Sequence, residues 1–504
     1  MFHNDVKSVT ADNPCFGLTA AVTAASPGCG ADATGAPATG LVSLAPDNMA
    51  HTINLAGGVN LPLRTRLNAS VGYSLRMQSE SFLPHTMNPS ITSPLLALPE
   101  QSLDGVVTTM LIHLSATSRP LRPLTLSMKY RLFDLADRRA EIVFPAHVVD
   151  DRTLVVEPRQ AGRWSYTKQN LDADGRWRFA PALATTLGGG WERWDRNDHR
   201  EVPASDEYFA RAALDVRPWS WLSSKLTYRP SWRRIDQYNT TAHLEHTVVE
   251  ELTPSAIAQG QSALLRKFDE ADRDRQRLDL LLQLMPTEAL TTTLSGGWTR
   301  DDHLRSPLGL QDATGWSAGV DLNWTPVERI ALFGGYTHES IFQKQRSRSR
   351  PVTGTTTFDF ADYDWISDNT DTVDTVHVGA TVGLIPRVLD WTFAASYAYA
   401  LGRVETRNPV APTSGTAAQQ AAAAAKPTPA FEDGLFRLET GLKYHFWKVW
   451  TASVGYAFES FDKHDWRTDT LNPFVPGITS IWLGNDLRNY AAHVVAVKLG
   501  YRFK

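Results

Sequence analysis

Apolar and polar residues alternate along much of this chain, in runs of about 8–12 residues. In the run from Leu67 to Met77, apolar side chains hold every second position, and polar or small side chains lie between them. The runs Leu124–Leu132 and Val495–Phe503 follow the same pattern. A period of two predicts β-strands with one apolar face. Runs of this length predict strands longer than the usual ~5–6 residues of a soluble sheet.

Short segments, most of them with a proline, separate pairs of these runs. They lie at 61–63, 119–123, 180–182, 217–219, 285–288, 325–328, 385–387 and, without proline, 446–449. Proline fixes φ and donates no backbone hydrogen bond, so it belongs at strand ends and turns. The segments therefore predict tight hairpin turns.

Most of the other connections are long and polar. They cover roughly 79–104, 133–163, 238–268, 343–371, 403–433 and 462–486. One of them holds the alanine-rich run Ala417–Ala425, which we expect to be a disordered loop rather than a helical turn. Short turns at one end and long loops at the other are typical of outer-membrane barrels.

The fold predicted from this pattern is all-β: a transmembrane antiparallel up-and-down β-barrel with short periplasmic turns and long extracellular loops. The alternating runs number about 17, and a further one near Asn4–Asn13 would give the even number that single-chain bacterial barrels usually have. We therefore favour about 18 strands. The barrel is expected over 49–504, and 1–48 is expected to hold at most one strand and a Gly/Ala-rich loop.

A soluble sandwich or propeller is the alternative, because it also hides one face of each strand. Strand length, unequal loops and charged polar faces favour the membrane barrel. Aromatic residues near the turns would then form the girdle at one membrane interface. They are Trp177, Phe179, Trp219, Trp221, Trp324, Phe446, Trp447 and Trp450.

Composition is compatible with a barrel but does not establish one. The 504 residues are 42% hydrophobic and 21% charged, as in many soluble proteins. No run of ~18 apolar residues occurs, so no helical membrane span is expected, whereas a membrane strand needs an apolar residue only at alternate positions. The net charge of −4 argues against a nucleic-acid partner. The start, MFHNDVKSVT, has neither the basic nor the apolar region of a signal peptide.

The chain carries no catalytic signature: no G-x-S-x-G, no H-E-x-x-H, no phosphate loop and no Cys/His cluster at metal-ligand spacing. We therefore predict a protein that is not an enzyme, with no catalytic, cofactor-binding or metal-binding residues. The carboxylate pairs are interpreted as lumen or loop charges; they are Asp172/Asp174, Asp272/Asp274 and Asp371/Asp374. The arginine-rich runs 273–277 and 346–350 are interpreted as solvated strand ends, with a docking role as the alternative.

Cys15 and Cys29 are the two cysteines of the chain, and both lie in the Gly/Ala-rich stretch. An exported loop meets oxidising conditions, so a disulfide between them is favoured over two unrelated thiols.

Several segments go beyond the general pattern of a barrel. They are SLAPDNM at 43–49, FLPHTMNP at 82–89, RKFDEADR at 266–273, SPLGL at 306–310, LFGGYTHE at 332–339, 346–352, Asp364-Trp365 and DTVDT at 371–375. With these segments the chain resembles the MtrB/PioB family of outer-membrane barrels associated with decahaem cytochromes, over nearly its whole length. The resemblance also implies a signal peptide and further N-terminal strands, so the chain is expected to be N-terminally truncated. The C-x-x-C found near the N-terminus of some family members is absent.

The resemblance implies an integral protein of the Gram-negative outer membrane that acts as a sheath. Such a barrel encloses a periplasmic multihaem c-type cytochrome, and its long loops meet a cytochrome on the cell surface. The haem belongs to the partner, because this chain has no C-x-x-C-H motif and is expected to bind no cofactor itself. A diffusion porin, general or specific for a substrate, is the alternative. An inward loop with opposed charges would favour the porin, and a wide unobstructed lumen would favour the sheath. An outer-membrane hydrolase has no residues to support it.

Overall fold

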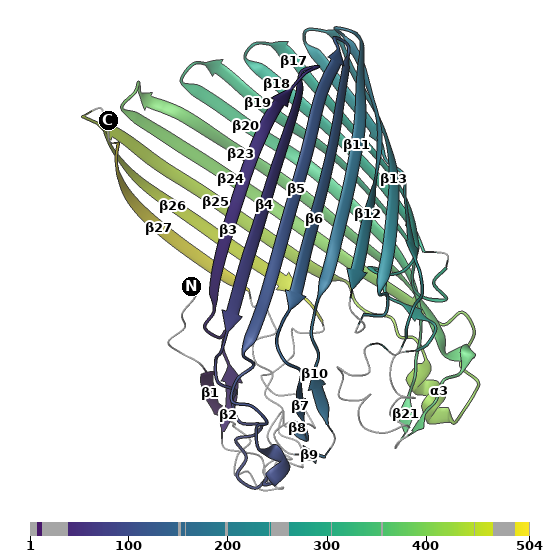
Figure 1. Ribbon diagram of the computed structural model, residues 1–504. Coiled ribbons are helices and arrows are strands. Elements are labelled where there is room, and N and C mark those ends of the chain that lie inside the picture. Colours follow the sequence, from purple (N-terminus) through teal and green to yellow (C-terminus); the bar gives the residue numbers. More distant parts are fainter. Residues whose placement is uncertain are drawn as a thin grey trace.

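Long tilted strands form the wall of a cylinder, with tight turns at one end and long connections at the other (Figure 1). The structure, a computed structural model, describes residues 8–12, 39–149, 153–156, 158–196, 200–240, 242, 262–303, 305–353, 356–447, 449–466 and 489–502. Neighbouring long strands pair antiparallel and in sequence order. The predicted up-and-down β-barrel is therefore confirmed. No helix of the described residues is long and apolar enough to cross a bilayer.

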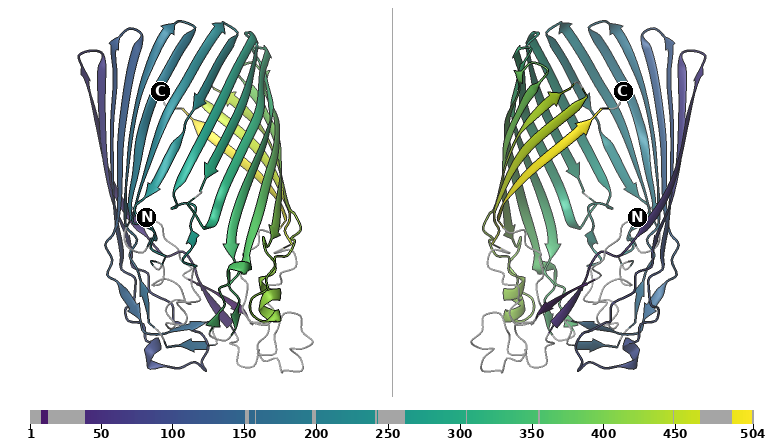
Figure 2. Two further views of the ribbon diagram at one scale, coloured as in Figure 1. Left: turned by 90° about the vertical axis from the view of Figure 1, so that its right-hand side faces the viewer. Right: turned by 90° about the vertical axis from the view of Figure 1, so that its left-hand side faces the viewer.

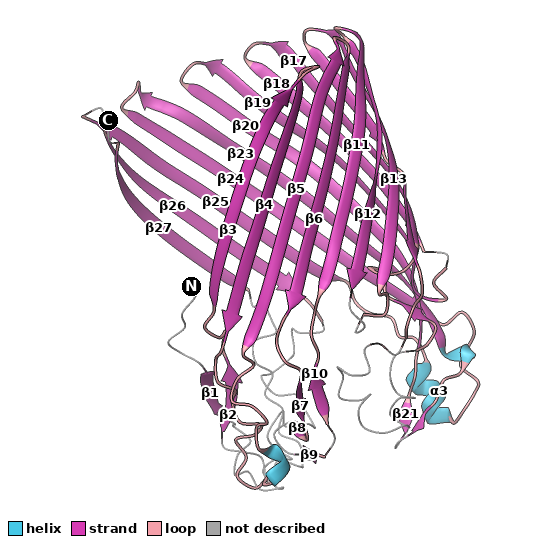
Figure 3. Ribbon diagram, in the orientation of Figure 1, coloured by secondary structure: helices cyan, strands magenta, loops and turns pink. Residues whose placement is uncertain are grey.

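The wall is made of long strands (Figure 3). They are β3 (Met49–Leu61), β4 (Thr65–Gln78), β5 (Gly105–Leu121), β6 (Leu124–Asp137), β11 (Tyr166–Ala180), β12 (Leu183–Arg196), β13 (Ala204–Trp219), β14 (Leu222–Tyr228), β15 (Ser231–Ile235), β17 (Arg273–Thr287), β18 (Leu290–Asp302), β19 (Leu308–Val327), β20 (Ile330–Arg348), β23 (Asp364–Ile385), β24 (Leu389–Arg407), β25 (Phe431–Phe446), β26 (Trp450–His464) and β27 (Tyr490–Tyr501).

The connections at the loop end carry short elements that lie beyond the wall (Figures 1 and 2). They are β1 (Ser8–Asp12), β2 (Thr39–Ser43), η1 (Pro94–Leu96), β7 (Ile142–Phe144), β8 (His147–Val149), β9 (Thr153–Val155), β10 (Arg159–Ala161), β21 (Val352–Thr353), β22 (Thr356–Thr357), η3 (Ala361–Tyr363) and α3 (Ala417–Ala423). The short strand β16 (Leu265–Arg266) pairs with the start of β19 at the edge of the wall.

The ring contains nineteen strand segments among the described residues. β14 and β15 continue one another across Pro230, since both pair with β13 and β17, and β16 has only two residues. Seventeen long positions remain, close to the predicted number of about 18. The strand expected near Asn4–Asn13 does not join the wall: β1 pairs with β2 in a separate sheet.

With an odd number of strand positions, the first and last strands of the wall, β3 and β27, run parallel rather than antiparallel. β27 and β3 are neighbours in the strand order, and both run from the loop end to the turn end. Among the described residues no ladder of paired residues joins them, whereas β26 pairs with β27 from Trp450 to Phe461. The outward Leu55 and Val497 are 70% and 74% exposed, against 50% for Val378 on the doubly paired β23. We call this junction the seam.

All eight predicted turns join neighbouring wall strands. The turn between β3 and β4 is tight, and Leu63 and Arg64 both have φ near +60°, at 61° and 53°. Two successive left-handed residues match the right-handed twist of a hairpin. The pattern of alternation together with these turns therefore suffices to place the strand pairs.

The alanine-rich run is an exception, because 417–423 forms a helix and not the loop that we expected. The Thr416 side chain accepts from the Gln419 backbone N–H, while the Gln419 side chain accepts from the Thr416 N–H, a capping box. Asn408 donates to the Ala423 carbonyl at 3.2 Å. Alanine's high helix propensity and these polar contacts at both ends explain the short helix.

The strand register places apolar side chains in rows on the outer face. Leu55, Val71, Ile112 and Leu132 are paired in line across β3 to β6. The adjacent row, whose side chains lie on the inner face, holds Ala56, Ser70, His113 and Arg131. Apolar side chains thus face outward and polar side chains face the lumen, as in a membrane barrel.

Candidate functional site

The inner wall is lined by charged side chains that form ion pairs between neighbouring strands. Arg211 on β13 lies 2.9 Å from Asp174 and 3.6 Å from Asp172, both on β11. Lys168 on β11 lies 3.1 Å from Glu192 on β12. The predicted pair Asp172/Asp174 is therefore a lumen charge, neutralised by an arginine two strands away.

The other carboxylate pairs do not act as units. Asp371 and Asp374 on β23 lie on opposite faces, because an odd number of positions separates them. Asp374 faces outward and accepts from His338 at 2.7 Å. Asp272 contacts Arg305 at 3.2 Å, and Asp274 contacts Arg234 at 2.6 Å. Each carboxylate serves a separate local contact, so no acid–base pair results.

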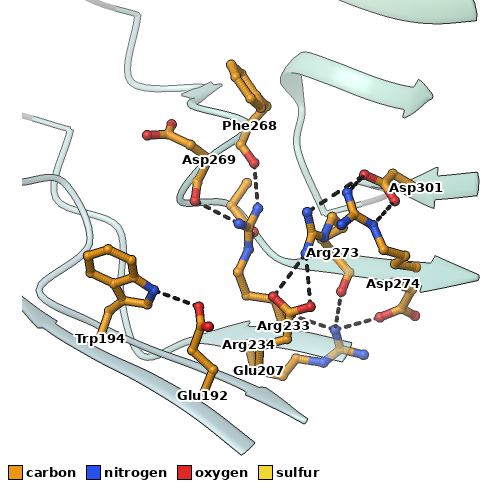
Figure 4. A network of polar contacts seen from close by, with 12 residues as sticks. Glu192, Trp194, Glu207, Arg233, Arg234, Phe268, Asp269, Arg273, Asp274 and Asp301 are labelled. Carbon is orange, nitrogen blue, oxygen red and sulfur yellow. Dashed lines mark hydrogen bonds and ion pairs between the residues drawn. The ribbon is translucent and has the colours of Figure 1, made fainter. Parts of the chain in front are cut away.

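A network of polar contacts lies at the loop end of β13, β15, β17 and β18 (Figure 4). Arg273 Nη2 donates to both carboxylate oxygens of Glu207 at 2.9 Å. Arg275 donates from Nε and Nη2 to the two oxygens of Asp301, at 2.6 and 2.5 Å. Bidentate pairs of this kind are directional and charge-assisted. They fix the order of the strand ends.

The same network holds a segment of the β15–β17 connection against the wall. Arg233 donates to the backbone carbonyls of Ala271 and Asp269, each at 2.7 Å, and to that of Phe268 (Figure 4). Leu265 and Arg266 of this segment pair in parallel with the start of β19. We call residues 265–272 the docked segment. It corresponds to most of the RKFDEADR motif of the sequence.

Two buried carboxylates lie where the docked segment meets the wall: Glu270 belongs to the segment and Glu201 contacts it. Glu201 forms an ion pair with Lys267, and Glu270 forms one with Arg200. Both glutamate side chains have almost no exposed surface. Burial raises the pKa of Glu270 and outweighs the opposing effect of Arg200. Burial also acts to raise the pKa of Glu201, but the hydrogen bond and charge of Lys267 outweigh it and lower that pKa.

His303 follows β18 directly and is 1% exposed. Burial, together with the positive charges of Arg233 and Arg273, lowers its pKa from 6.5 to about 4, although Asp301 opposes this. His303 is therefore neutral at physiological pH.

The second arginine-rich run has a comparable structural role. Arg346 and Arg348 both donate to Asp364, and Arg348 also donates to Asp359 at 2.9 Å. Both runs thus lie at strand ends, as interpreted from the sequence, and most of their described ion pairs are with carboxylates of wall strands. A docking role stays a prediction.

The outer face has two aromatic levels. Near the turns lie the predicted girdle residues, including Trp219, Trp324 and Trp447, which are largely exposed. A second level, nearer the loops, was not predicted and lies on β12, β13, β15, β18 and β19. Its members are Trp191, Tyr208, Trp232, Trp298 and Trp316.

Outward-facing charged side chains lie next to this second level, mostly further toward the loops. Arg193 lies 3.0 Å from Asp206, Arg234 lies 2.6 Å from Asp274, and Arg300 lies 3.1 Å from Asp312. An apolar band bounded by aromatic residues and then by charges is the profile that a bilayer imposes on a barrel. The band therefore marks the membrane position.

Comparisons with known proteins agree with this geometry. The family model described as "Putative outer membrane beta-barrel porin, MtrB/PioB" matches residues 1–503. The chain belongs to the MtrB/PioB family. It is an integral β-barrel of the outer membrane, and neither this family nor the fold is that of an enzyme.

Individual relatives are distant. The outer membrane protein MtrB of Shewanella baltica (strain OS185) is 22% identical over 350 residues, which cover 68% of this chain and 45% of MtrB. The chain thus spans about half the length of that MtrB/PioB relative. The ferric-catecholate import receptor Fiu of E. coli K12 has a similar fold, with a TM-score of 0.50 at 10% identity, covering 91% of this chain and 68% of the receptor.

Three further points compare the sequence with the structure: the cysteines, metal binding and the docked segment. Cys15 and Cys29, and with them the expected disulfide, lie outside the described residues. Within the described part of the chain, no group of three or more His, Cys, Asp or Glu side chains could hold a metal ion. The docked segment belongs to the RKFDEADR motif of the sequence, but no feature of the sequence predicted its contact with Arg233.

Proposed function

We propose that this barrel is a sheath for a periplasmic multihaem c-type cytochrome and serves electron transfer across the outer membrane. Membership in the MtrB/PioB family carries the proposal, because the resemblance described above implies this role. Barrels of 16–18 strands leave a water-filled lumen. The labelled short elements of the connections, such as β1, β7 and α3, lie beyond the loop end of the long strands (Figure 1), an arrangement that suits an enclosed partner protein.

In this proposal the haem belongs to the cytochrome, and the barrel does no chemistry. The ion-paired inner wall offers polar contacts to the enclosed protein, while the outer apolar band keeps lipid away from it. The connections at the loop end, with their docked elements, would contact a cytochrome at the cell surface.

A diffusion porin is the second candidate. Charged side chains of both signs on the inner wall, such as Lys129 and Glu339, are exposed and would suit a water-filled channel.

Co-purification separates the two candidates. The tagged protein is expressed in its native host, the outer membrane is extracted in mild detergent, and c-type haem absorbance is measured per barrel. Stoichiometric haem on a second polypeptide supports the sheath. A haem-free barrel that conducts ions in a planar bilayer contradicts it and supports the porin.

A further inference from the structure

One side of the lumen is lined by basic residues. On β4, β5 and β6 the charged inward positions below the loop end are Arg66, Arg76, Lys129 and Arg131. His113 lies between them, opposite Arg131 in the register. These three strands are fully described, and their inward positions hold one carboxylate, Asp137. It is the last residue of β6 and pairs with Arg139. We call Arg66, Arg76, Lys129 and Arg131 the basic arc.

Another part of the wall is lined by acidic residues. The charged inward positions of β19, β20, β23 and β24 are Asp321, Glu339, Asp371 and Asp390. These four strands are fully described, and no lysine or arginine holds an inward position on them. His377 lies 3.5 Å from Asp321. We call the four carboxylates the acidic arc.

The two arcs face each other across the lumen. In one direction round the ring, β6 and β19 are separated by β11, β12, β13, β14/β15, β17 and β18. In the other direction, β4 and β24 are separated by β3, β27, β26 and β25. The arcs therefore lie on roughly opposite sides. Figure 1 shows β4–β6 in front and β19–β24 behind them.

The rest of the wall is different, because its charges are largely neutralised locally. Arg176 lies 3.2 Å from Asp215, and Arg437 lies 2.8 Å from Glu459. By contrast, Lys129 and Glu339 are exposed and form no ion pair within the described residues. In the acidic arc, Asp390 contacts His445 at 3.4 Å, as Asp321 contacts His377, and no described ion pair joins this arc to a lysine or arginine. Charges gathered by sign on opposite walls produce a field directed across the lumen.

We propose that this field orients the protein inside the barrel: an acidic face of the enclosed cytochrome lies against β4–β6, and a basic face lies against β19–β24. The inference rests on the proposed sheath function and adds the charge pattern and rotational orientation of the partner. Complementary charge across an interface selects orientation and partner more than it adds affinity. The mixed wall between the arcs contributes contacts without choosing an orientation.

Site-specific photo-cross-linking tests the orientation. Benzoylphenylalanine replaces Ser127 beside the basic arc or Thr337 beside the acidic arc, in the complex purified from the native host. Mass spectrometry identifies the partner peptides, and haem absorbance reports occupancy. We expect acid-rich partner peptides at 127 and base-rich peptides at 337. Stoichiometric haem with the same partner segment at both sites, or with the reverse pattern, overturns the orientation but leaves the sheath. Absence of haem overturns both.

Charge reversal gives a second, independent measurement. The double variant K129E/R131E should lower haem per barrel about tenfold at low salt, because two attractive contacts become repulsive. K225E reverses an inward charge on β14, outside both arcs, and should retain the haem. Heat-modifiable gel mobility checks that each barrel is folded. Equal haem loss in folded K225E and K129E/R131E barrels would overturn the proposal.

Discussion

Arg233 Nε donates to the carbonyl oxygen of Ala271 at 2.7 Å, across 38 positions of the chain. With its further contacts to Asp269 and Phe268, one guanidinium holds three carbonyls of a connection that would otherwise leave the wall. Hydrogen bonds from a charged donor are worth about 1.5–3 kcal/mol each. Arg233 is therefore one main anchor of the docked segment, beside the ion pairs of Lys267 and Glu270 and the short pairing with β19.

Arg233→Gln should release the docked segment without opening the wall. A glutamine is shorter and uncharged, so it cannot reach three carbonyls. We expect amide hydrogen exchange of 265–272 to rise at least about tenfold, since loss of one charge-assisted hydrogen bond already corresponds to that factor. Arg234→Gln is the matched control, because Arg234 pairs outward with Asp274. Equal exchange in both variants would show that Arg233 does not hold the segment.

Docking of this segment should weaken as the pH falls below 6.5. His303 has a pKa of about 4 when buried and 6.5 when free, so the released form binds a proton that the docked form does not. Release should therefore increase by up to about tenfold per pH unit between pH 6.5 and 4. The groups facing His303 are Asp301, Arg233 and Arg273.

His303→Gln isolates this effect. The raised pKa of Glu270 acts in the opposite direction, since the docked form holds that proton more tightly, and it remains in both proteins. Hydrogen exchange of 265–272 should thus depend less on pH in the variant. An unchanged pH dependence would mean that His303 is not neutral when the segment is docked.

Much of the wall follows from sequence alone. Alternation such as Leu67 to Met77 defines which face a strand buries, and the proline turns define which strands pair. These are local signals with a fixed period, so they survive without knowledge of the tertiary structure. The turn-side girdle could be predicted for the same reason, since its residues adjoin recognisable turns.

The loop-end contacts could not be predicted in this way. Arg233 meets Ala271, and Asp362 accepts from the backbone N–H groups of Thr413 and Ser414 at 2.7 and 2.9 Å. These contacts join connections far apart in sequence, and no periodicity encodes them. The two arcs could not be predicted either, because only the ring order shows that the strands of Lys129 and Glu339 lie on opposite sides of the lumen.

Adjacent leucines on β17 should respond differently to the same substitution. Leu280 pairs with Leu226 and Gly296 in the outward row, whereas Leu281 pairs with Lys225 and Ser295 in the inward row. An arginine facing lipid near the middle of the membrane costs about 2–4 kcal/mol. Leu280→Arg should therefore lower the free energy of unfolding in lipid vesicles by that amount, while Leu281→Arg should change it little. Urea titration followed by tryptophan fluorescence measures both, and a larger loss for Leu281→Arg would reverse the assigned faces.

The seam should be the place where the backbone of the wall exchanges fastest. In a strand paired on one side, every second N–H points away from its partner. For β3 these groups face β27, and no ladder of described residues joins the two strands. We expect about half of the amides in β3 and β27 to exchange rapidly in detergent, while β23 and β24, paired on both sides, stay protected. Protection of β3 and β27 equal to that of β23 would mean that backbone hydrogen bonds close the ring there, as a parallel pair among antiparallel strands. Rapid exchange confined to these two strands would locate the weakest line of the barrel, and with it the place where lipid or another strand has access to unpaired backbone.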